Sequence, residues 1–286
     1  MRKLSIRHLT EYRYTAPVRF LPHRLFLRPR EGHDVRIVNS LLDITPGHSI
    51  VWHRDAFDNS VAVVTFSQPS TSLRILSELT IEAYDEVAYD FPLEPYATQF
   101  PFQYDSLERM ELMPYQQLLF AKEDDALRIW ASQFWSPGVQ VPSADLLMRI
   151  NSAVAQGFSY TRREEPGVQR PSETLANGSG SCRDFATLFM ETCRFLGLAA
   201  RFVTGYLHAP NLPAADGATH AWTEVYLPGV GWRGYDSTTG QICGSNHITV
   251  AVNRHPENVP PVAGAFEGNG NPTGMNVQVA VFEHSA

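Results

Sequence analysis

The amino-acid sequence predicts an α+β protein in which an N-terminal β-sandwich precedes a domain of helices and strands. Residues 3–85 contain short runs of alternating or β-branched residues, with turn-forming residues between the runs. Clear helical periodicity comes later, most strongly over residues 182–196. Residues 220–236 then show two short β-type runs around a Pro-Gly turn. Strands followed by helices and a further hairpin are typical of the α+β class.

The N-terminal part is predicted to be one domain over residues 1–90. Its strand-like runs are Leu4–Tyr14, Val35–Thr45, Ile50–His53, Val61–Phe66 and Leu73–Tyr84. Turn signals such as Pro46-Gly47 and Asp58-Asn59 separate them. Several short strands at this spacing predict a β-sandwich. A length of 286 residues and an apolar fraction of 43% allow two domains with cores of their own.

Residues 91–115 are rich in Pro, Tyr and Phe and show no period. We expect an ordered, packed linker there, because its aromatic side chains need a surface to cover. Residues 116–286 are expected to form the second domain. Helices are predicted over residues 124–134 and 143–156, the latter with Ser143 as a cap. Residues 268–274 are rich in Gly and Asn and predict a tight turn between strands.

The segment from Cys182 to Leu196 predicts an amphipathic helix. Its apolar face comprises Phe185, Leu188, Phe189, Phe195 and Leu196. Asp184 suits the first turn and Arg194 the last, and Gly197 follows as a C-cap. Because a Gly-Ser turn precedes it, Cys182 is expected at the helix N-terminus, where free N–H groups and the helix dipole stabilise a thiolate. The backbone N–H of Cys182 is then a candidate oxyanion donor.

Downstream of this cysteine, His220 and Asp236 stand at the two ends of a predicted hairpin. Residues 221–227 and 232–235 are its strands and residues 228–231 its turn. Antiparallel pairing brings position 220 close to position 236, where a carboxylate can orient an imidazole and stabilise its protonated form. A thiol, an imidazole and a carboxylate together predict a cysteine-based acyl-transfer site.

The other cysteines and histidines are expected to be structural. Cys193 lies in the middle of the predicted helix and Cys243 in a loop, and a cysteine is usually a small buried apolar residue. The histidines considered as rival bases have no carboxylate placed across a hairpin; they are His208, His247 and His255. Arg183 and Asp184 are expected to form local ion pairs or helix caps. Asp236 taken alone would be an ordinary turn residue.

Four motifs give the chain a resemblance to a known family. They are CRDFA from Cys182, RFVTGY from Arg201, HAW from His220 and GWRGYDST from Gly231. The chain resembles the transglutaminase-like cysteine protease family, in particular bacterial members with an N-terminal β domain, and residues 4–29 and 247–266 share this likeness. The resemblance implies a papain-like α/β core with a Cys–His–Asp triad at Cys182, His220 and Asp236. The family usually has Asp-Pro-Thr at the third site, where this chain has Asp236-Ser237-Thr238, and loss of the proline is expected to loosen the turn.

Three aromatic residues are candidates for substrate binding: Tyr160, Trp222 and Tyr206. Their side chains could line the groove for the acyl group or assist the oxyanion, and core packing is the alternative for each of them. The polar loop 162–169 precedes the nucleophile. It is expected either to frame the substrate cleft or to be a solvated connection.

Composition argues against several classes of function. With 23 basic and 30 acidic residues the net charge is -7, so no nucleic-acid partner is expected. There is no stretch of roughly 20 apolar residues and no apolar signal region, so no membrane partner is expected and a cytoplasmic location is predicted. Three cysteines, an odd number, argue against a disulfide framework. The sequence has no C-x-x-C pair, H-E-x-x-H motif, phosphate loop or acidic calcium loop, so neither a metal nor a cofactor is expected.

Three hypotheses about function follow. The favoured one is a cysteine peptidase or amidase that acts on a peptide or protein substrate through a thioester. The second is a protein-glutamine acyl transferase, in which an amine rather than water resolves the thioester. The third is a non-catalytic binding module on the same fold, and the intact thiol, imidazole and carboxylate argue against it. The oligomeric state stays open.

Overall fold

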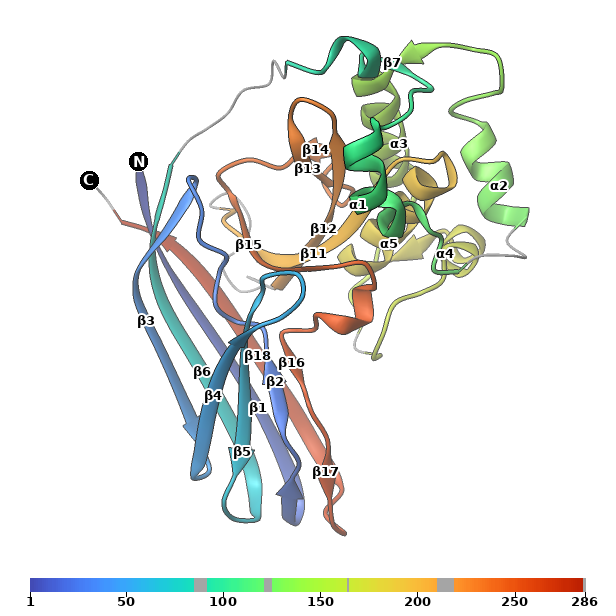
Figure 1. Cartoon of the computed structure of the whole chain (residues 1–286). Helices are drawn as coiled ribbons and strands as arrows, with labels where there is room; N and C mark the ends of the chain where they lie inside the picture. The colour runs from blue at the N-terminus through green and yellow to red at the C-terminus, as the bar shows by residue number, and fades with distance from the viewer. Residues whose placement is uncertain (85–91, 121–124, 164, 210–218, 285–286) are drawn as a thin grey trace.

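The computed structural model describes residues 1–84, 92–120, 125–163, 165–209 and 219–284. Figure 1 shows a β-sandwich of long strands in its lower half and a smaller sheet covered by helices in its upper half. This arrangement confirms the predicted α+β class. Among the described residues, no helix is both long enough and apolar enough to cross a lipid bilayer.

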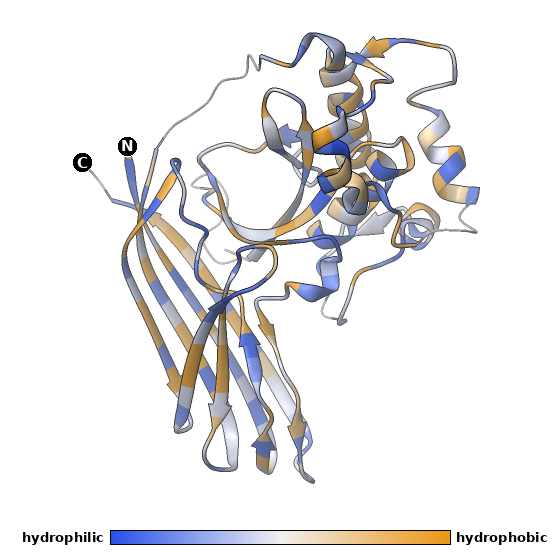
Figure 2. Ribbon diagram, in the orientation of Figure 1, coloured by the Kyte–Doolittle hydropathy of each residue, from blue (hydrophilic) through white to orange (hydrophobic). Residues whose placement is uncertain are grey.

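Two antiparallel sheets form the sandwich. The first has the order β17-β1-β6-β3, with β18 also paired to β1, and the second has the order β16-β2-β5-β4. Their bounds are β1 Arg2–Phe20, β2 His23–Leu25, β3 Val35–Thr45, β4 His48–Arg54, β5 Ser60–Phe66, β6 Ser70–Ala83, β16 Val262–Ala263, β17 Phe266–Glu267 and β18 Pro272–Glu283. Hydrophilic and hydrophobic residues alternate along these strands (Figure 2), so one side of each sheet faces inward. Val64, Leu73 and Ile75 are buried between the sheets.

The C-terminal segment completes the sandwich. β18 runs antiparallel to β1 from the pair Leu4–Glu283 to the pair Tyr14–Pro272, and the two chain ends lie close together in Figure 1. The expected division, with all of residues 116–286 in the second domain, therefore differs from the structure, because residues 262–283 pair with N-terminal strands. Pairing between strands so distant in the chain leaves no trace in local periodicity. The turn predicted at residues 268–274 is found between β17 and β18, but it is shorter than expected, because residues 272–274 already belong to β18.

The segment expected to be an aperiodic linker contains regular structure. It has a 3-10 turn at Pro95–Ala97, β7 at Gln99–Phe100 and α1 at Ser106–Gln116, and β7 pairs with β8 at Val141–Pro142. The Asp105 side chain caps α1 by accepting two backbone hydrogen bonds. Phe100 and Tyr104 are buried, as aromatic residues of a packed segment should be. Periodicity missed α1 because the helix contains Pro114 and buries only Leu112 fully.

The second part is built on a five-stranded antiparallel sheet in the order β14-β13-β12-β11-β15. Its strands are β11 Ala200–Leu207, β12 Thr219–Leu227, β13 Gly231–Asp236, β14 Gln241–Ile242 and β15 His247–Asn253. The helices are α2 Asp125–Ser132, α3 Ser143–Gly157, α4 Pro171–Asn177 and α5 Cys182–Phe195. The short strands β9 Ser159–Tyr160 and β10 Ser179–Gly180 pair in parallel. The predicted hairpin is β12–β13, and α2, α3 and α5 match the predicted helices, although residue 124 lies outside the described residues.

Helix α5 packs against β11 and β12 at the centre of this part, and its residues 184–194 are all buried. They include an ion pair, in which the Arg194 guanidinium lies 3.0 Å from the Glu191 carboxylate. Arg194 also donates to the carbonyls of Ala200 and Arg254, so its charge is well satisfied. The apolar cluster around α5 continues into the sandwich and includes Leu4 and Ile6 of β1. The helix that carries Cys182 is therefore held from all sides.

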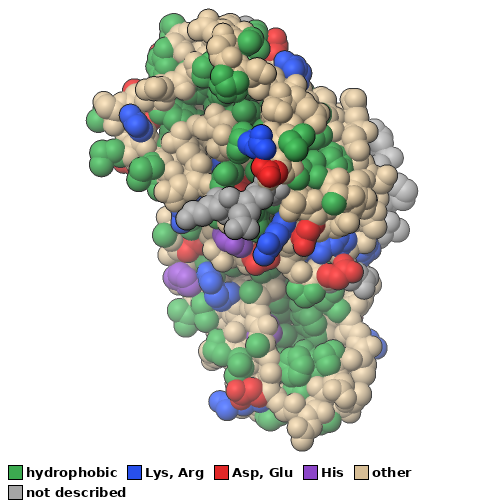
Figure 3. All heavy atoms as spheres, turned by 90° about the vertical axis from the view of Figure 1, so that its right-hand side faces the viewer, with side chains coloured by type: hydrophobic (Ala, Val, Ile, Leu, Met, Phe, Trp, Pro, Cys, Tyr) green, Lys and Arg blue, Asp and Glu red, His purple; other side chains and the backbone are tan. Residues whose placement is uncertain are grey.

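The surface carries charges of both signs. On the face drawn in Figure 3, Lys, Arg, Asp and Glu side chains are interspersed across the middle, with hydrophobic side chains above and below. Exposed ion pairs include Arg7 with Glu78 at 3.4 Å. Such pairs contribute at most about 1 kcal/mol each, so the buried apolar clusters dominate stability.

Candidate active site

A tight connection between α4 and α5 places Cys182 at the first position of α5. Gly178 ends α4 in the left-handed conformation, with φ of 62°. β10 then pairs with β9, and Ser181 is the N-cap of α5. A Cβ atom on Gly180 would lie 2.9 Å from Cβ of Asp184, so this approach requires glycine. The thiol lies at the positive end of the helix dipole, as the sequence predicts.

Asp184 ties this helix start to the preceding loop. Its Oδ2 accepts hydrogen bonds from the backbone N–H of Ser181 at 2.8 Å and from its hydroxyl at 2.7 Å. Its Oδ1 accepts from Arg163 and from the N–H of Gln169, both at 2.7 Å. Burial alone would raise the pKa of Asp184, but these hydrogen bonds hold it below its usual value. Asp184 is thus a helix cap, and Arg183 donates to the carbonyls of Arg163 and Glu165 in the same loop.

His220 lies between Cys182 and Asp236. It stands at the start of β12, and Asp236 ends the neighbouring strand β13. Nε2 of His220 is 2.9 Å from Oδ2 of Asp236, and the same imidazole lies close enough to the thiol of Cys182 for the two to interact. Because Nε2 faces Asp236, Nδ1 is the nitrogen left for the thiol. The His220 side chain is 10% exposed and that of Asp236 is fully buried. The structure therefore brings together the three residues that the sequence singled out.

The electrostatics of this group favour a charged imidazole. Burial lowers the pKa of His220, but the hydrogen bonds to Asp236 and Cys182 and their negative charges outweigh burial and raise it to about 10. Burial likewise raises the pKa of Asp236, and the hydrogen bonds from two imidazoles, His220 and His247, reverse this and hold it well below its usual value. The carboxylate is accordingly ionised and the imidazole keeps its proton at neutral pH.

The turn after Asp236 is held by hydrogen bonds rather than by a proline. The N–H of Thr238 donates to Oδ1 of Asp236 at 2.9 Å, and the N–H of Gly240 donates to the Asp236 carbonyl at 2.8 Å. The buried hydroxyl of Ser237 donates to Oδ1 of Asn151 on α3 at 2.8 Å. Ser237 thus anchors the turn to a helix at the position where the family usually has a proline.

His247 is a member of the site that the sequence analysis missed. It begins β15, and its Nε2 lies 3.2 Å from Oδ2 of Asp236. His247 has no carboxylate across a hairpin, as expected, but it has one from a strand that is not its neighbour, because Asp236 serves both His220 and His247. Neither local spacing nor hairpin geometry signals this contact, since β13 and β15 are not neighbouring strands in the sheet.

The side chains of His220, Asp236 and His247 also have the spacing of a metal site, with ligand atoms within 4.8 Å of one another. Two imidazoles and a carboxylate are suitable ligands for a transition metal. However, the N–H of Gly244 donates to Nδ1 of His247 at 3.3 Å, so a neutral His247 carries its proton on Nε2 and directs it at Asp236. The observed arrangement is that of a hydrogen-bonded carboxylate. The expectation that no metal binds rested on short sequence motifs. His220, Asp236 and His247 are far apart in the sequence, so no such motif contains them.

Two of the three proposed substrate-binding aromatics are interior residues. Trp222 is 1% exposed and packs against His247, with ring centroids 5.3 Å apart. Tyr206 is also 1% exposed, and its hydroxyl bonds to His8 and to the Leu27 carbonyl in the sandwich. Of the two alternatives for Trp222 and Tyr206, the structure shows core packing and not a substrate groove, because neither side chain reaches the surface.

Tyr160 differs from these two aromatics because it is 54% exposed. It lies on β9, paired with Gly180 just before the nucleophile. Partial burial and the nearby Cys182 raise the pKa of its hydroxyl, so the ring is neutral and close to the thiol. Tyr160 stays a candidate for contact with substrate.

The remaining thiols and rival histidines have structural surroundings. Cys193 is fully buried in α5, and burial raises its pKa, as burial also does for Cys243. His208 is hydrogen-bonded to Arg2 at 2.7 Å. His255 accepts a hydrogen bond from the N–H of Glu257 and so caps a 3-10 turn. Cys193, Cys243, His208 and His255 therefore have structural surroundings, unlike Cys182 and His220.

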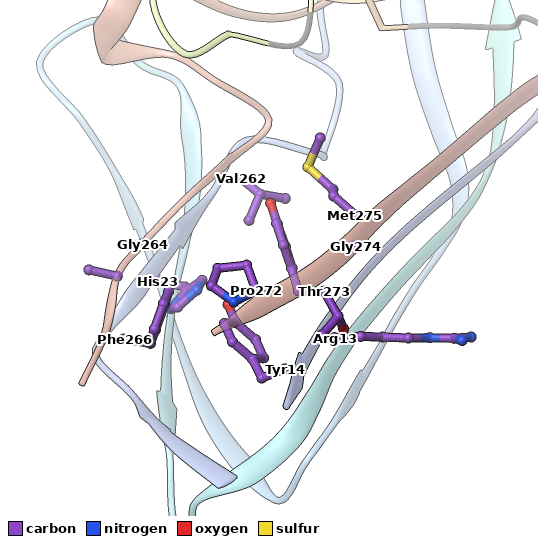
Figure 4. Close-up of a pocket in the computed structure, with 12 residues that line it drawn as sticks. Arg13, Tyr14, His23, Val262, Gly264, Phe266, Pro272, Thr273, Gly274 and Met275 are labelled. Carbon is purple, nitrogen blue, oxygen red and sulfur yellow. The ribbon is translucent and has the colours of Figure 1, made fainter. Parts of the chain in front are cut away.

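A cavity of about 570 Å³ lies in the sandwich (Figure 4). Tyr14 of β1, His23 of β2 and Met275 of β18 contribute to its lining. No residue of the Cys182 group is among its lining residues.

The chain matches two family models. Residues 4–82 match the bacterial transglutaminase-like N-terminal region, and residues 136–237 match the transglutaminase-like superfamily. An uncharacterized protein of Mycobacterium tuberculosis is 28% identical over 293 residues, which cover 98% of this chain and 92% of that protein. An uncharacterized protein of Mycobacterium leprae is 24% identical over 297 residues, which cover 98% and 99%. Both matches agree with the family resemblance inferred from the sequence motifs.

A crystal structure from Cytophaga hutchinsonii, described as that of a putative cysteine protease, has a similar fold. It aligns with a TM-score of 0.73 at 19% identity, covering 100% of this chain and 92% of that chain. The similarity extends over both the sandwich and the helical part, so the two-part architecture is shared.

Proposed function

We propose that the chain is a cysteine-dependent amide-bond hydrolase of the transglutaminase-like superfamily, with Cys182 as nucleophile, His220 as acid and base, and Asp236 as orienting carboxylate. One observation carries this proposal: a single buried imidazole is hydrogen-bonded to an ionised carboxylate and lies beside the thiol of Cys182, which helps to raise its pKa. This is the connectivity of a nucleophile, a base and an orienting group.

In the proposed reaction, Cys182 and His220 form a thiolate–imidazolium pair. The thiolate attacks the carbonyl carbon of an amide, and the carbonyl oxygen becomes an oxyanion. The N–H of Cys182 lies at the N-terminus of α5, where helix N–H groups lack helical acceptors and favour negative charge. His220 then gives a proton to the leaving amine, the C–N bond breaks, and a thioester with Cys182 remains.

Water completes the cycle in the hydrolase. Neutral His220 takes a proton from the water as it attacks the thioester, and the acid product leaves with the thiolate restored. If a primary amine attacks instead, the product is a new amide and the enzyme is an acyl transferase. We favour hydrolysis of a peptide or protein chain and propose Tyr160 as a contact for the acyl side, since it is exposed beside Cys182.

The test uses fluorescein-labelled casein as a general acyl donor, with and without monodansylcadaverine. Hydrolysis predicts release of small fluorescent peptides that is lost in Cys182→Ala, whereas transfer predicts dansyl label on casein. Cys243→Ala is the matched control, because it removes a thiol outside the group and should keep activity. Release of peptides by Cys182→Ala at the wild-type rate would refute the assignment of the nucleophile.

A further inference from the structure

The carboxylate of Asp236 is divided between two imidazoles. Oδ2 lies 2.9 Å from Nε2 of His220 and 3.2 Å from Nε2 of His247. Oδ1 accepts a separate hydrogen bond, at 2.9 Å, from the N–H of Thr238. Asp236 is fully buried, so these donors replace water as its solvation. A carboxylate oxygen with two N–H donors offers less negative charge to each of them.

The orientation of His247 is fixed by two neighbours. The N–H of Gly244 can only donate, so Nδ1 of His247 must accept and Nε2 must carry the proton. The Trp222 ring meets the His247 ring edge-on, at an interplanar angle of 77°. Two glycines make room for the Trp222 ring: a Cβ would lie 2.5 Å from it at Gly205 and 3.3 Å from it at Gly234. His247 is therefore placed to donate to Asp236.

Several titratable groups surround His247. Asp236 on β13 and His220 on β12 are closest, with the His220 and His247 ring centroids 6.2 Å apart. Cys243, next to β14, is an interior thiol whose pKa burial raises, so it adds no charge at neutral pH. Arg2 of β1 is hydrogen-bonded to Asn246, the residue before His247, at 2.8 Å. The His247 hydrogen bond itself goes to Asp236, so its influence on His220 passes through that carboxylate.

We propose that His247 is a positioning residue that shares the Asp236 carboxylate with His220 and thereby limits how tightly His220 holds its proton. This inference rests on the proposed function of Cys182 and His220. Because Thr238 already fixes the orientation of the Asp236 carboxylate, His247 acts mainly by reducing the negative charge that this carboxylate presents to His220. An imidazolium that holds its proton too tightly is a poor acid for the leaving amine. His247 therefore favours departure of the amine at a small cost to the thiolate–imidazolium pair.

The test measures the pH dependence of Cys182 alkylation by iodoacetamide, and casein hydrolysis, in wild type, His247→Leu and His247→Gln. In His247→Leu, loss of the second donor should raise the pKa of His220 and so move the alkaline limit of the pH profile of hydrolysis up by about half a pH unit to one unit. It should also lower kcat several-fold with little change in KM. The Gln side chain can present an N–H near the place of Nε2, so His247→Gln should restore most of both properties.

Two results would overturn the inference. One is a His247→Leu protein that folds normally by circular dichroism and keeps the alkaline limit of wild-type hydrolysis. The other is a His247→Gln protein that behaves like His247→Leu, since a donor would then be irrelevant. Failure of the proposed function looks different: Cys182 of the wild type itself would then label like an ordinary thiol, with or without His220.

Discussion

Asp236 is the residue on which the charge of the site depends. Asp236→Asn keeps the shape but removes the negative charge, so the pKa of His220 should fall from about 10 toward its usual value. His220 would then lose its proton within the neutral range, and kcat/KM at pH 7 should fall by roughly 10³–10⁴-fold. The alkaline limit of the pH–rate profile should also move to lower pH. Glu224→Gln is the control, because Glu224 pairs with Arg201 on the same sheet and should leave the profile unchanged.

Ser237 gives a second prediction for a single residue. Ser237→Ala removes the donor to Oδ1 of Asn151 and leaves a buried acceptor without this partner, which should lower the free energy of unfolding by about 1–3 kcal/mol. Thr239→Ala removes an exposed hydroxyl from the same turn and should cost less. Urea denaturation followed by circular dichroism compares the two variants. Equal losses would mean that the Ser237 hydrogen bond does not anchor the turn.

The sequence predicted single residues well where the chemistry is local. Cys182 was placed by helix rules, and His220 and Asp236 by the ends of one hairpin, and the three do lie together. The errors concern side-chain direction. Trp222 and Tyr206 lie in strands buried on both faces, so alternation could not show which way they point. His247 was missed because its contact with Asp236 joins residues of two strands that are not neighbours in the sheet.

At the scale of elements, the sheet in the second part depends on a close approach at Gly205 of β11. A Cβ there would lie 2.2 Å from the Ile248 carbonyl oxygen and 2.5 Å from Trp222. Gly205→Ala should therefore displace β15 or Trp222, lower stability by about 1–3 kcal/mol, and reduce activity because Trp222 supports both imidazoles. Gly157→Ala, at the end of α3 with no atom within 4 Å of the new Cβ, should be harmless. Thermal unfolding and casein hydrolysis check both variants, and normal activity in a stable Gly205→Ala protein would contradict this role.

Elements with a strong period were predictable and those without one were not. The helical period over α5 and the alternation in the sandwich strands predicted both kinds of element correctly, but Phe195, expected on the buried face of α5, is exposed. α1 was missed, because a helix that exposes Leu107 and Met110 has no marked apolar face toward the interior. The pairing of β18 with β1 depends on contacts between the two ends of the chain, which no local pattern records.

For the whole molecule, His8 links the sandwich to the second part and predicts a pH dependence of stability. It is 2% exposed and bonds to the Tyr206 hydroxyl at 3.1 Å, and burial lowers its pKa from 6.5 to about 4. Below pH 6.5 the unfolded chain takes up this proton before the folded one does. Stability should therefore be full above pH 6.5 and decline by about 3 kcal/mol as pH falls to 4.

Urea denaturation at several pH values measures this effect. His8→Gln keeps a polar side chain that does not titrate, so its stability should decline less between pH 6.5 and 4 than that of wild type. The difference between the two proteins isolates His8 from other titrating groups, including the partly buried His23. Identical pH dependence in both proteins would mean that His8 does not contribute.

The two parts of the molecule are joined by polar as well as apolar contacts. Asn59, which is fully buried, donates to the Val252 carbonyl at 2.8 Å and accepts from the Val252 N–H at 2.9 Å. Through these bonds a sandwich loop holds β15, the strand that begins with His247. The sandwich thus braces the sheet that carries the site, and this connection was beyond the reach of sequence patterns because the partners are 193 residues apart.

The central claim, that Cys182 and His220 form a reactive ion pair, is tested most directly by the rate of cysteine alkylation with iodoacetamide from pH 5 to 9. Peptide mass spectrometry reads each cysteine separately, in wild type and in His220→Ala, and the fully buried Cys193 serves as an internal reference. We predict fast labelling of Cys182 at pH 6 in wild type and its loss in His220→Ala. Labelling of wild-type Cys182 only as pH approaches about 8.5, as for an ordinary thiol, and unchanged in His220→Ala, would contradict the claim.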